Sequence, residues 1–321
     1  MVRVFWVFCQ LGWEILFINR RATNALYREL ESIIGPAGYS LNESHKKRIF
    51  FYTAQSVITN FWFSVLRGMR PSKQERQDAL YLGAFTPIAD DLMDSTGQTF
   101  EQLQKDDKKH SADALLFDYL LNKLQPIITS SNHFSSYFDK AHQAQNESLK
   151  QLRQEELSIE ELRQISYDKG GYYTTLYRFA LRHEPQAGEE EAIYTLGSIL
   201  QLLNDLFDIH KDHHNGVQTL VTHSKDIRFI RAELTSLERQ FKSQFMQLDY
   251  PEQNKRRSHT SIMAIVTRGH VALDHYEKLQ GSASKLSVTD YERKALIVDM
   301  EKLGNIWKNL KATERVIFAS Q

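Results

Sequence analysis

The sequence predicts an all-α protein, and three observations support this prediction. Turn residues are scarce, since the 321 residues include only 14 glycines and 6 prolines, roughly half of their average use. Helix-start signals, in which Ser or Thr is followed three residues later by Glu or Gln, precede stretches of helical period. The few glycines and prolines mark joints at helix-sized intervals. No repeat or linker divides the chain, so we expect a single domain, residues 1–321, of roughly ten helices.

Charge and cysteine content exclude several classes of protein. The 40 Lys and Arg residues balance the 40 Asp and Glu residues, so the broad basic surface that binds nucleic acid is absent and we expect no such partner. A hydrophobic content of 41% argues against disorder. The single Cys9 cannot form an internal disulfide, and no CxxC zinc pair is present. A reducing compartment is favoured, and we expect a cytoplasmic protein.

The first expected element is an apolar helix within residues 1–35. The run Val2–Ile18 is interrupted by Arg3, Gln10 and Glu14, and it is shorter than the about 20 apolar residues of a membrane-spanning helix. No convincing signal-cleavage site follows it. We therefore expect a helix that packs on the core; the alternatives are an extension that does not order and peripheral contact with a membrane through aromatic side chains. These side chains are Phe5, Trp6, Phe8 and Trp13.

Four further helix starts are expected from capping pairs. The pairs are Ser40 with Glu43, Ser72 with Glu75, Thr99 with Gln102, and Ser158 with Glu161. In each pair, side chain and backbone satisfy donors that a helix start leaves free. The second pair should open the helix that leads to an acidic cluster, and the fourth should open the helix LRQISYDKGGYYTTLYRFALR.

The first acidic cluster lies in AFTPIADDLMDST. Asp90 and Asp94 are four residues apart, so on a helix they share a face about 6 Å apart along the axis, with Asp91 beside them. Their neighbours are apolar, and three like charges in such a place need a cation. Carboxylate oxygens together with phosphate usually hold Mg²⁺. We predict a metal site; the alternative is that one or two of these residues cap a helix beginning at Pro87.

The second cluster lies in YTLGSILQLLNDLFDIHKDHHNG. Asn204, Asp208 and Asp212 recur every four residues behind an apolar run, so their oxygens can line one groove of one helix, with Asp205 at its edge. Burying these carboxylates without a partner would be costly. We predict that the two clusters face each other and hold divalent ions that bind a polyanion such as diphosphate. An alternative takes the following histidines as ligands of a transition metal. They are His210, His213 and His214, acting together with Asp208 and Asp212.

Together the two clusters resemble the metal motifs of the class I isoprenoid synthases. Asp90-Asp91-x-x-Asp94 matches their DDxxD motif, and NDLFDIHKD is most similar to the NxxxDxxxD motif of squalene and phytoene synthases. The resemblance covers roughly Asn60 to Leu220 and includes FWFSVLRGMRPSKQERQDALYLGAFTPIADDLMD, which is similar to the segment that leads into the first motif. It implies the isoprenoid synthase fold, an all-α bundle around a central cavity.

The resemblance also implies an activity: a Mg²⁺-dependent enzyme, with Mn²⁺ as a substitute, that ionises an allylic prenyl diphosphate and releases diphosphate. The implied metal ligands are Asp90, Asp91, Asp94, Asn204, Asp208 and Asp212. The implied catalytic residues are Asp90, Asp94, Asp208 and Lys169. The basic residues implied to hold diphosphate oxygens are Lys169, Arg67 and Lys211. Aromatic candidates to stabilise a carbocation are Phe51, Phe61, Phe63, Phe85, Tyr172, Tyr173, Tyr177 and Phe179.

Three other functions stay open at this point. Lys169, Gly197 and Gln201 resemble positions of the chain-elongating trans-prenyltransferases, while Asn204 matches the first residue of the NDxxSxxxE motif of terpene cyclases. The third possible function is of another class: a helical protein that binds prenyl lipids without turnover. It stays open because Thr86-Pro87 stands where squalene and phytoene synthases have an Arg. In each case we expect a monomer or a homodimer.

Overall fold

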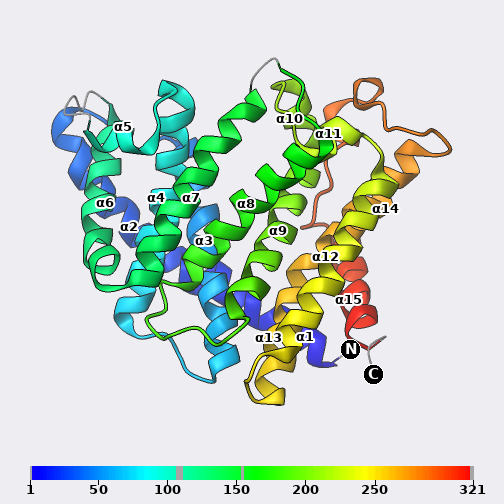
Figure 1. Ribbon diagram of the computed structural model, residues 1–321, viewed down its shortest axis with the longest axis horizontal. Coiled ribbons are helices and arrows are strands. Elements are labelled where there is room, and N and C mark those ends of the chain that lie inside the picture. The colour runs from blue at the N-terminus through cyan, green and yellow to red at the C-terminus, as the bar shows by residue number, and fades with distance from the viewer. Residues whose placement is uncertain (1, 106–110, 153–154, 319–321) are drawn as a thin grey trace. The chain divides into compact units, whose positions relative to one another are not determined.

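The computed structural model describes residues 2–105, 111–152 and 155–318, and its regular elements are helices (Figure 1). The prediction of an all-α protein is therefore confirmed for these residues. They form more α-helices than the roughly ten expected, partly because some helices are too short for a helical period to show in the sequence. These are α5 (Phe100–Lys105), α10 (Ile209–His214) and α11 (Leu220–Ser224).

The helices belong to two compact units. The N-terminal unit consists of residues 9–146 and 173–184, and the C-terminal unit consists of residues 1–8, 147–172 and 185–321. Each unit collects segments that are distant in sequence, so neither corresponds to one continuous stretch of chain. The organisation of residues 1–321 as one domain stays a prediction.

Long helices build the N-terminal unit. They are α2 (Arg20–Ile34), α3 (Glu43–Arg67), α4 (Lys73–Thr96), α6 (Ala112–Ser130) and α7 (Asn132–Ser148), with the 3₁₀ turn η2 (Gly35–Ala37). Helix α4 packs against both α3 and α6. A Cβ atom on Gly83 of α4 would lie 2.6 Å from the Cα atom of Thr53 of α3. Only glycine therefore permits this approach of the two backbones, since interiors tolerate overpacking poorly.

The C-terminal unit is also built from packed helices. Its main elements are α8 (Ile159–Arg178, up to Tyr172), α9 (Glu189–Phe207), α12 (Ile227–Gln247), α13 (Glu252–Val266), α14 (Arg268–Gln280) and α15 (Leu303–Phe318), with 3₁₀ turns η3 (Leu149–Leu152), η4 (Val288–Asp290) and η5 (Arg293–Ala295). Helices α8 and α9 approach closely, because a Cβ atom on Gly170 or on Gly197 would lie 2.2 Å from the carbonyl oxygen of the other. Lys169, the residue before Gly170, therefore lies on α8 next to the point of closest approach to α9.

Most of the predicted helix starts are confirmed. Ser72 and Glu75 form a complete capping box at α4, and the Thr99 and Ser158 pairs make the expected reciprocal hydrogen bonds. The Ser40 prediction is wrong. Asn42 caps α3 instead, and its side chain accepts a hydrogen bond from the backbone N–H of His45 at 2.8 Å. Asparagine and serine are about equally good in this position, so the pattern alone did not separate them.

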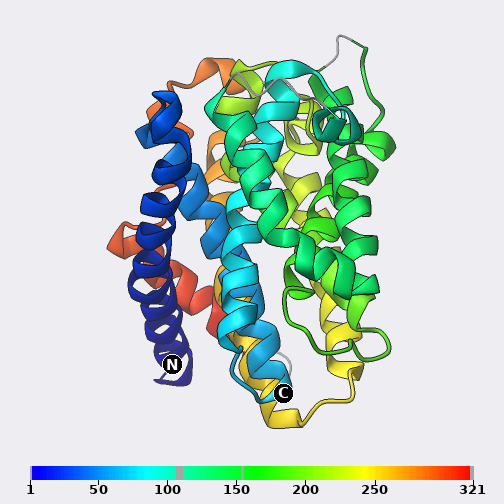
Figure 2. The ribbon, with the colours of Figure 1, turned by 90° about the vertical axis from the view of Figure 1, so that its left-hand side faces the viewer.

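The N-terminal segment is helical throughout. Helix α1 (Val2–Trp13), the π-helical turn η1 (Glu14–Asn19) and α2 follow one another without a break, and Figure 2 shows them as one long rod in dark blue. Val4 and Leu11 are buried as expected, but several aromatic side chains are exposed. The expectation that the whole segment packs on a core is therefore wrong for one of its faces.

One helix, α3, is long and apolar enough to cross a membrane among the helices of the described residues. However, 56% of its apolar window is buried inside the structure. Core helices of other proteins meet the same test of length and composition, so this helix is weak support for a membrane span.

Candidate functional site

The first acidic cluster lies in the second half of α4, far from the helix start at Lys73. The alternative that these aspartates cap a helix is therefore wrong. Asp90 is buried and accepts a hydrogen bond from the hydroxyl of Tyr173 at 3.3 Å. Burial, together with the negative charge of Asp90, raises the pKa of Tyr173 well above its usual value, so Tyr173 remains a hydrogen-bond donor to this carboxylate.

The other two aspartates of this cluster differ from Asp90. Asp91 is half-buried and forms an ion pair with Arg48 of α3 at 2.5 Å, whereas Asp94 is exposed. Burial raises the pKa of Asp91, the charge of Arg48 opposes this rise, and Asp113 and Asp94 add to it. The cavity beside Asp91 has a volume of only about 10 Å³, and Arg48 is the main counter-charge of this carboxylate. Arg48 could not be predicted from the sequence, because its position depends on how α3 packs on α4.

In the second cluster the helix does not continue as predicted. Helix α9 ends at Phe207 and α10 begins at Ile209, with Asp208 between them at φ −92° and ψ 8°. Backbone hydrogen bonds from Asp208 to Asn204 (2.9 Å) and from Asp212 to Asp208 (2.8 Å) still span four residues. The spacing that the sequence predicted is therefore kept, while the prediction of one unbroken helix is wrong.

The residues of the second cluster also differ in how deeply they are buried. Asn204 is exposed, Asp208 is half-buried, and Asp205, placed only at the edge of the groove by the sequence, is 3% exposed. The carboxylate of Asp205 accepts hydrogen bonds from Gln201 (2.8 Å) and Ser166 (3.1 Å). The Gln201 bond could have been found from its four-residue spacing. Ser166 could not, because it lies on another helix.

Mutual repulsion characterises the carboxylates of this second cluster. Burial raises the pKa of Asp205 to about 6, although its hydrogen bonds and the charge of Lys169 oppose the rise. Burial, followed by the charges of Asp205 and Asp208, raises the pKa of Asp212 to about 7. Lys169 is half-buried, and its positive charge acts on both carboxylates. Lys169, predicted from the sequence to be a basic residue of the site, therefore lies beside the second acidic cluster.

Asp212→Asn is expected to stabilise the metal-free protein at pH 8 by on the order of 2 kcal/mol, but not at pH 4. The pKa of Asp212 is higher in the folded than in the unfolded protein. Ionisation therefore costs more in the folded state, and stability is lost as the pH rises from the unfolded pKa through about 7. Urea unfolding in EDTA at pH 4, 6 and 8 measures the difference. A gain that does not depend on pH would contradict this assignment.

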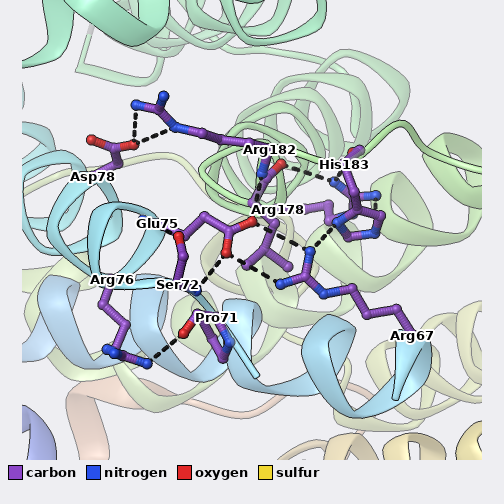
Figure 3. Close-up of polar contacts among 10 residues, drawn as sticks. Arg67, Pro71, Ser72, Glu75, Arg76, Asp78, Arg178, Arg182 and His183 are labelled. Carbon is purple, nitrogen blue, oxygen red and sulfur yellow. Dashed lines mark hydrogen bonds and ion pairs between the residues drawn. The ribbon is translucent and has the colours of Figure 1, made fainter. Parts of the chain in front are cut away.

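Arg67 and Lys211, predicted to hold diphosphate, lie in different settings. The guanidinium of Arg67 pairs with both carboxylate oxygens of Glu75 at 3.3 Å and contacts Nδ1 of His183 at 2.7 Å (Figure 3). Its side chain is only 9% exposed. Lys211 is exposed and pairs with Asp208 at 3.2 Å. Lys211 is therefore free to move, whereas Arg67 would have to leave a buried ion pair to hold a phosphate.

The aromatic candidates are mostly core residues. Tyr173, Tyr177, Phe63, Phe85 and Phe179 are buried, whereas Phe51 is exposed. Phe85 lies in a cluster of rings with other aromatic side chains of the N-terminal unit. Among these candidates, the hydroxyl of Tyr173 contacts an acidic residue of the predicted site.

No group of three or more His, Cys, Asp or Glu side chains in the described part of the chain is arranged to hold a metal ion. The transition-metal alternative at His210, His213 and His214 therefore gains no support. Mg²⁺ has a weaker requirement, because proteins commonly bind it through one or two carboxylates while substrate phosphates and water supply the other ligands. The oxygen donors of the two clusters fit Mg²⁺ in kind.

The fold and these residues define an all-α protein with two groups of partly buried carboxylates, one on α4 and one at the junction of α9 and α10. Comparison with known proteins adds no family: no family model, no curated protein and no solved structure matches the chain.

Proposed function

We propose that this protein is a Mg²⁺-dependent class I isoprenoid enzyme that ionises an allylic prenyl diphosphate and releases diphosphate. The proposal rests chiefly on three buried aspartates: Asp90 of α4, Asp205 of α9 and Asp212 of α10 are 4%, 3% and 9% exposed. Buried carboxylates are costly without compensation, and the raised pKa values of Asp205 and Asp212 express this cost. A divalent cation would offset it.

The proposal assigns the residues of the chain to binding and orienting the diphosphate. Oxygen atoms of Asp90 and Asp94 on α4, and of Asn204, Asp208 and Asp212 near the end of α9, are ligands of the type that Mg²⁺ prefers. Bound Mg²⁺ would supply neutralisation of the charge on the leaving diphosphate. Asp91 already has Arg48 as its counter-charge, so the proposal gives it a smaller role.

Two further side chains, those of Lys169 and Tyr173, support the proposed site. Lys169, whose charge acts on Asp205 and Asp212, would donate hydrogen bonds to a phosphate oxygen. Tyr173 would hold the carboxylate of Asp90 in one orientation through its hydroxyl. The isoprenoid synthase fold, and the choice of squalene and phytoene synthase-like chemistry over chain elongation or cyclisation, are part of the proposal.

Diphosphate release from farnesyl or geranylgeranyl diphosphate should require Mg²⁺ or Mn²⁺ and should not require zinc, because every proposed ligand is an oxygen atom. A coupled assay for diphosphate, run after EDTA treatment and with each metal added back, measures this requirement. Full turnover after exhaustive EDTA treatment would contradict the proposal. A folded protein that binds the prenyl diphosphate but releases no diphosphate would favour the binding-protein alternative.

A further inference from the structure

The N-terminal rod carries a concentration of exposed apolar side chains. Six of the fourteen large hydrophobic residues that are exposed in the described part of the chain lie between residues 5 and 18. Five of them are more than half exposed. Three of the five lie in the N-terminal unit, and we call these three the aromatic face: Trp13, Leu16 and Phe17. Contiguous apolar surface of this kind usually marks a site of interaction.

The helix that exposes these side chains packs against α3 on its other side. Trp13, Leu16 and Phe17 have the spacing of one helix face, and the rings of Trp13 and Phe17 stack with their centroids 4.6 Å apart. On the other side, Asn19 is buried and its side-chain amide donates to the hydroxyl of Thr53 of α3 at 3.5 Å. The aromatic side chains are thus held toward solvent by packing.

Basic residues flank this face. Arg20 and Arg21 follow directly and are exposed, and Glu14 is the one carboxylate between residues 2 and 28. Burial raises the pKa of Glu14, and the positive charges of Arg70 and Arg76 oppose the rise. Arg70 lies in the connection between α3 and α4, and Arg76 lies in the first turn of α4. Both guanidinium groups are therefore near the rod. The apolar face has a positive border.

We propose that the aromatic face lies in the interface of a membrane that contains anionic lipids. Trp and Phe side chains gain by burial at headgroup level, where the indole N–H keeps a polar contact. Arg20 and Arg21 would contact the lipid phosphates. A second copy of the chain fits this face less well, because it would bring Arg20 and Arg21 of both copies together with Glu14 as the one nearby carboxylate of each copy. This inference does not depend on the proposed enzymatic function.

Sedimentation of the full chain with lipid vesicles tests the proposal. We expect binding to phosphatidylcholine vesicles that contain phosphatidylserine, and weaker binding at high salt or to phosphatidylcholine alone. Trp13→Glu and Phe17→Glu should each lower the partition coefficient at least about tenfold, because a charge replaces an inserted ring. Arg20→Gln and Arg21→Gln should each lower it about fivefold, since a basic residue at an anionic surface contributes about 1 kcal/mol.

Trp307→Glu provides the matched control, because Trp307 of α15 is a similarly exposed tryptophan. Its partition coefficient should equal that of the unchanged protein, and circular dichroism verifies that each variant is folded. Wild-type binding by Trp13→Glu, or an equal loss in Trp307→Glu, would overturn the proposal. The proposal would also be overturned if the unchanged protein bound no vesicles and formed a dimer that Trp13→Glu dissociates.

Fluorescence gives a second measurement that needs no destabilising substitution. Brominated lipids should quench the emission of the unchanged protein, and Trp13→Phe should remove part of the quenched signal. Emission that brominated anionic vesicles do not quench would exclude insertion of this face.

Discussion

Replacing Asp90 or Asp208 by asparagine is expected to reduce diphosphate release at least about 100-fold, with little change in stability. The amide has the shape of the carboxylate and can still accept the hydrogen bond that Tyr173 donates to Asp90, but it lacks the charge that binds Mg²⁺. If both residues act on one leaving group, the double variant should lose little more than either single variant, because residues that act as a unit are not additive. Steady-state release of diphosphate over a range of Mg²⁺ concentrations measures these effects.

Asp249→Asn is the control for this series, because Asp249 is an exposed aspartate after the end of α12. It should keep the rate and the Mg²⁺ dependence of the unchanged protein. An Asp208→Asn variant that keeps the same rate, or one that unfolds, would make the second cluster structural. Losses that multiply in the double variant would mean that the two clusters act separately.

Glu75→Ala is expected to lower the free energy of unfolding by about 3 to 5 kcal/mol. The side chains of Arg67 and Glu75 are 9% and 8% exposed, and Glu75 also accepts hydrogen bonds from the backbone N–H groups of Ser72 (2.7 Å) and Arg182 (2.9 Å) (Figure 3). Removing the carboxylate leaves a buried guanidinium and two backbone donors without this acceptor. Urea unfolding at neutral pH measures the loss.

The same loss should depend on pH. Burial raises the pKa of Glu75, but hydrogen bonds from Arg67 and from the two backbone N–H groups outweigh burial and lower it to about 2. Because the folded pKa is below the unfolded one, the stabilisation is present above the unfolded pKa and is lost as the pH falls toward 2. The difference between Glu75→Gln and the unchanged protein should therefore shrink in acid.

A surface glutamate provides the comparison for this second series. Glu160 also pairs with an arginine, Arg163 at 3.6 Å, but its side chain is largely exposed. Glu160→Ala should cost less than about 0.5 kcal/mol, since exposed ion pairs are weak. Equal costs for Glu75→Ala and Glu160→Ala would show that the buried cluster does not stabilise the fold.

Features that depend on neighbouring residues in the chain could be predicted from the sequence. The scarcity of turn residues predicted the all-α class, and the capping pairs at Ser72 and Ser158 predicted two helix starts correctly. The four-residue spacing of Asn204, Asp208 and Asp212 also persists in backbone hydrogen bonds. Each of these features arises from hydrogen bonds that span three or four residues, so the local sequence contains the necessary information.

Burial and partners were decided by the tertiary structure. Helical period showed that several carboxylates share a face, but packing made Asp205 more buried than Asn204 and placed Arg48 against Asp91. Packing likewise put Arg67 in a buried ion pair with Glu75 and left Trp13 exposed. A helical pattern shows which residues lie together on one face, whereas the helix that covers this face comes from a distant part of the chain. Only the packed structure determines which charges lose water and which charge compensates each of them.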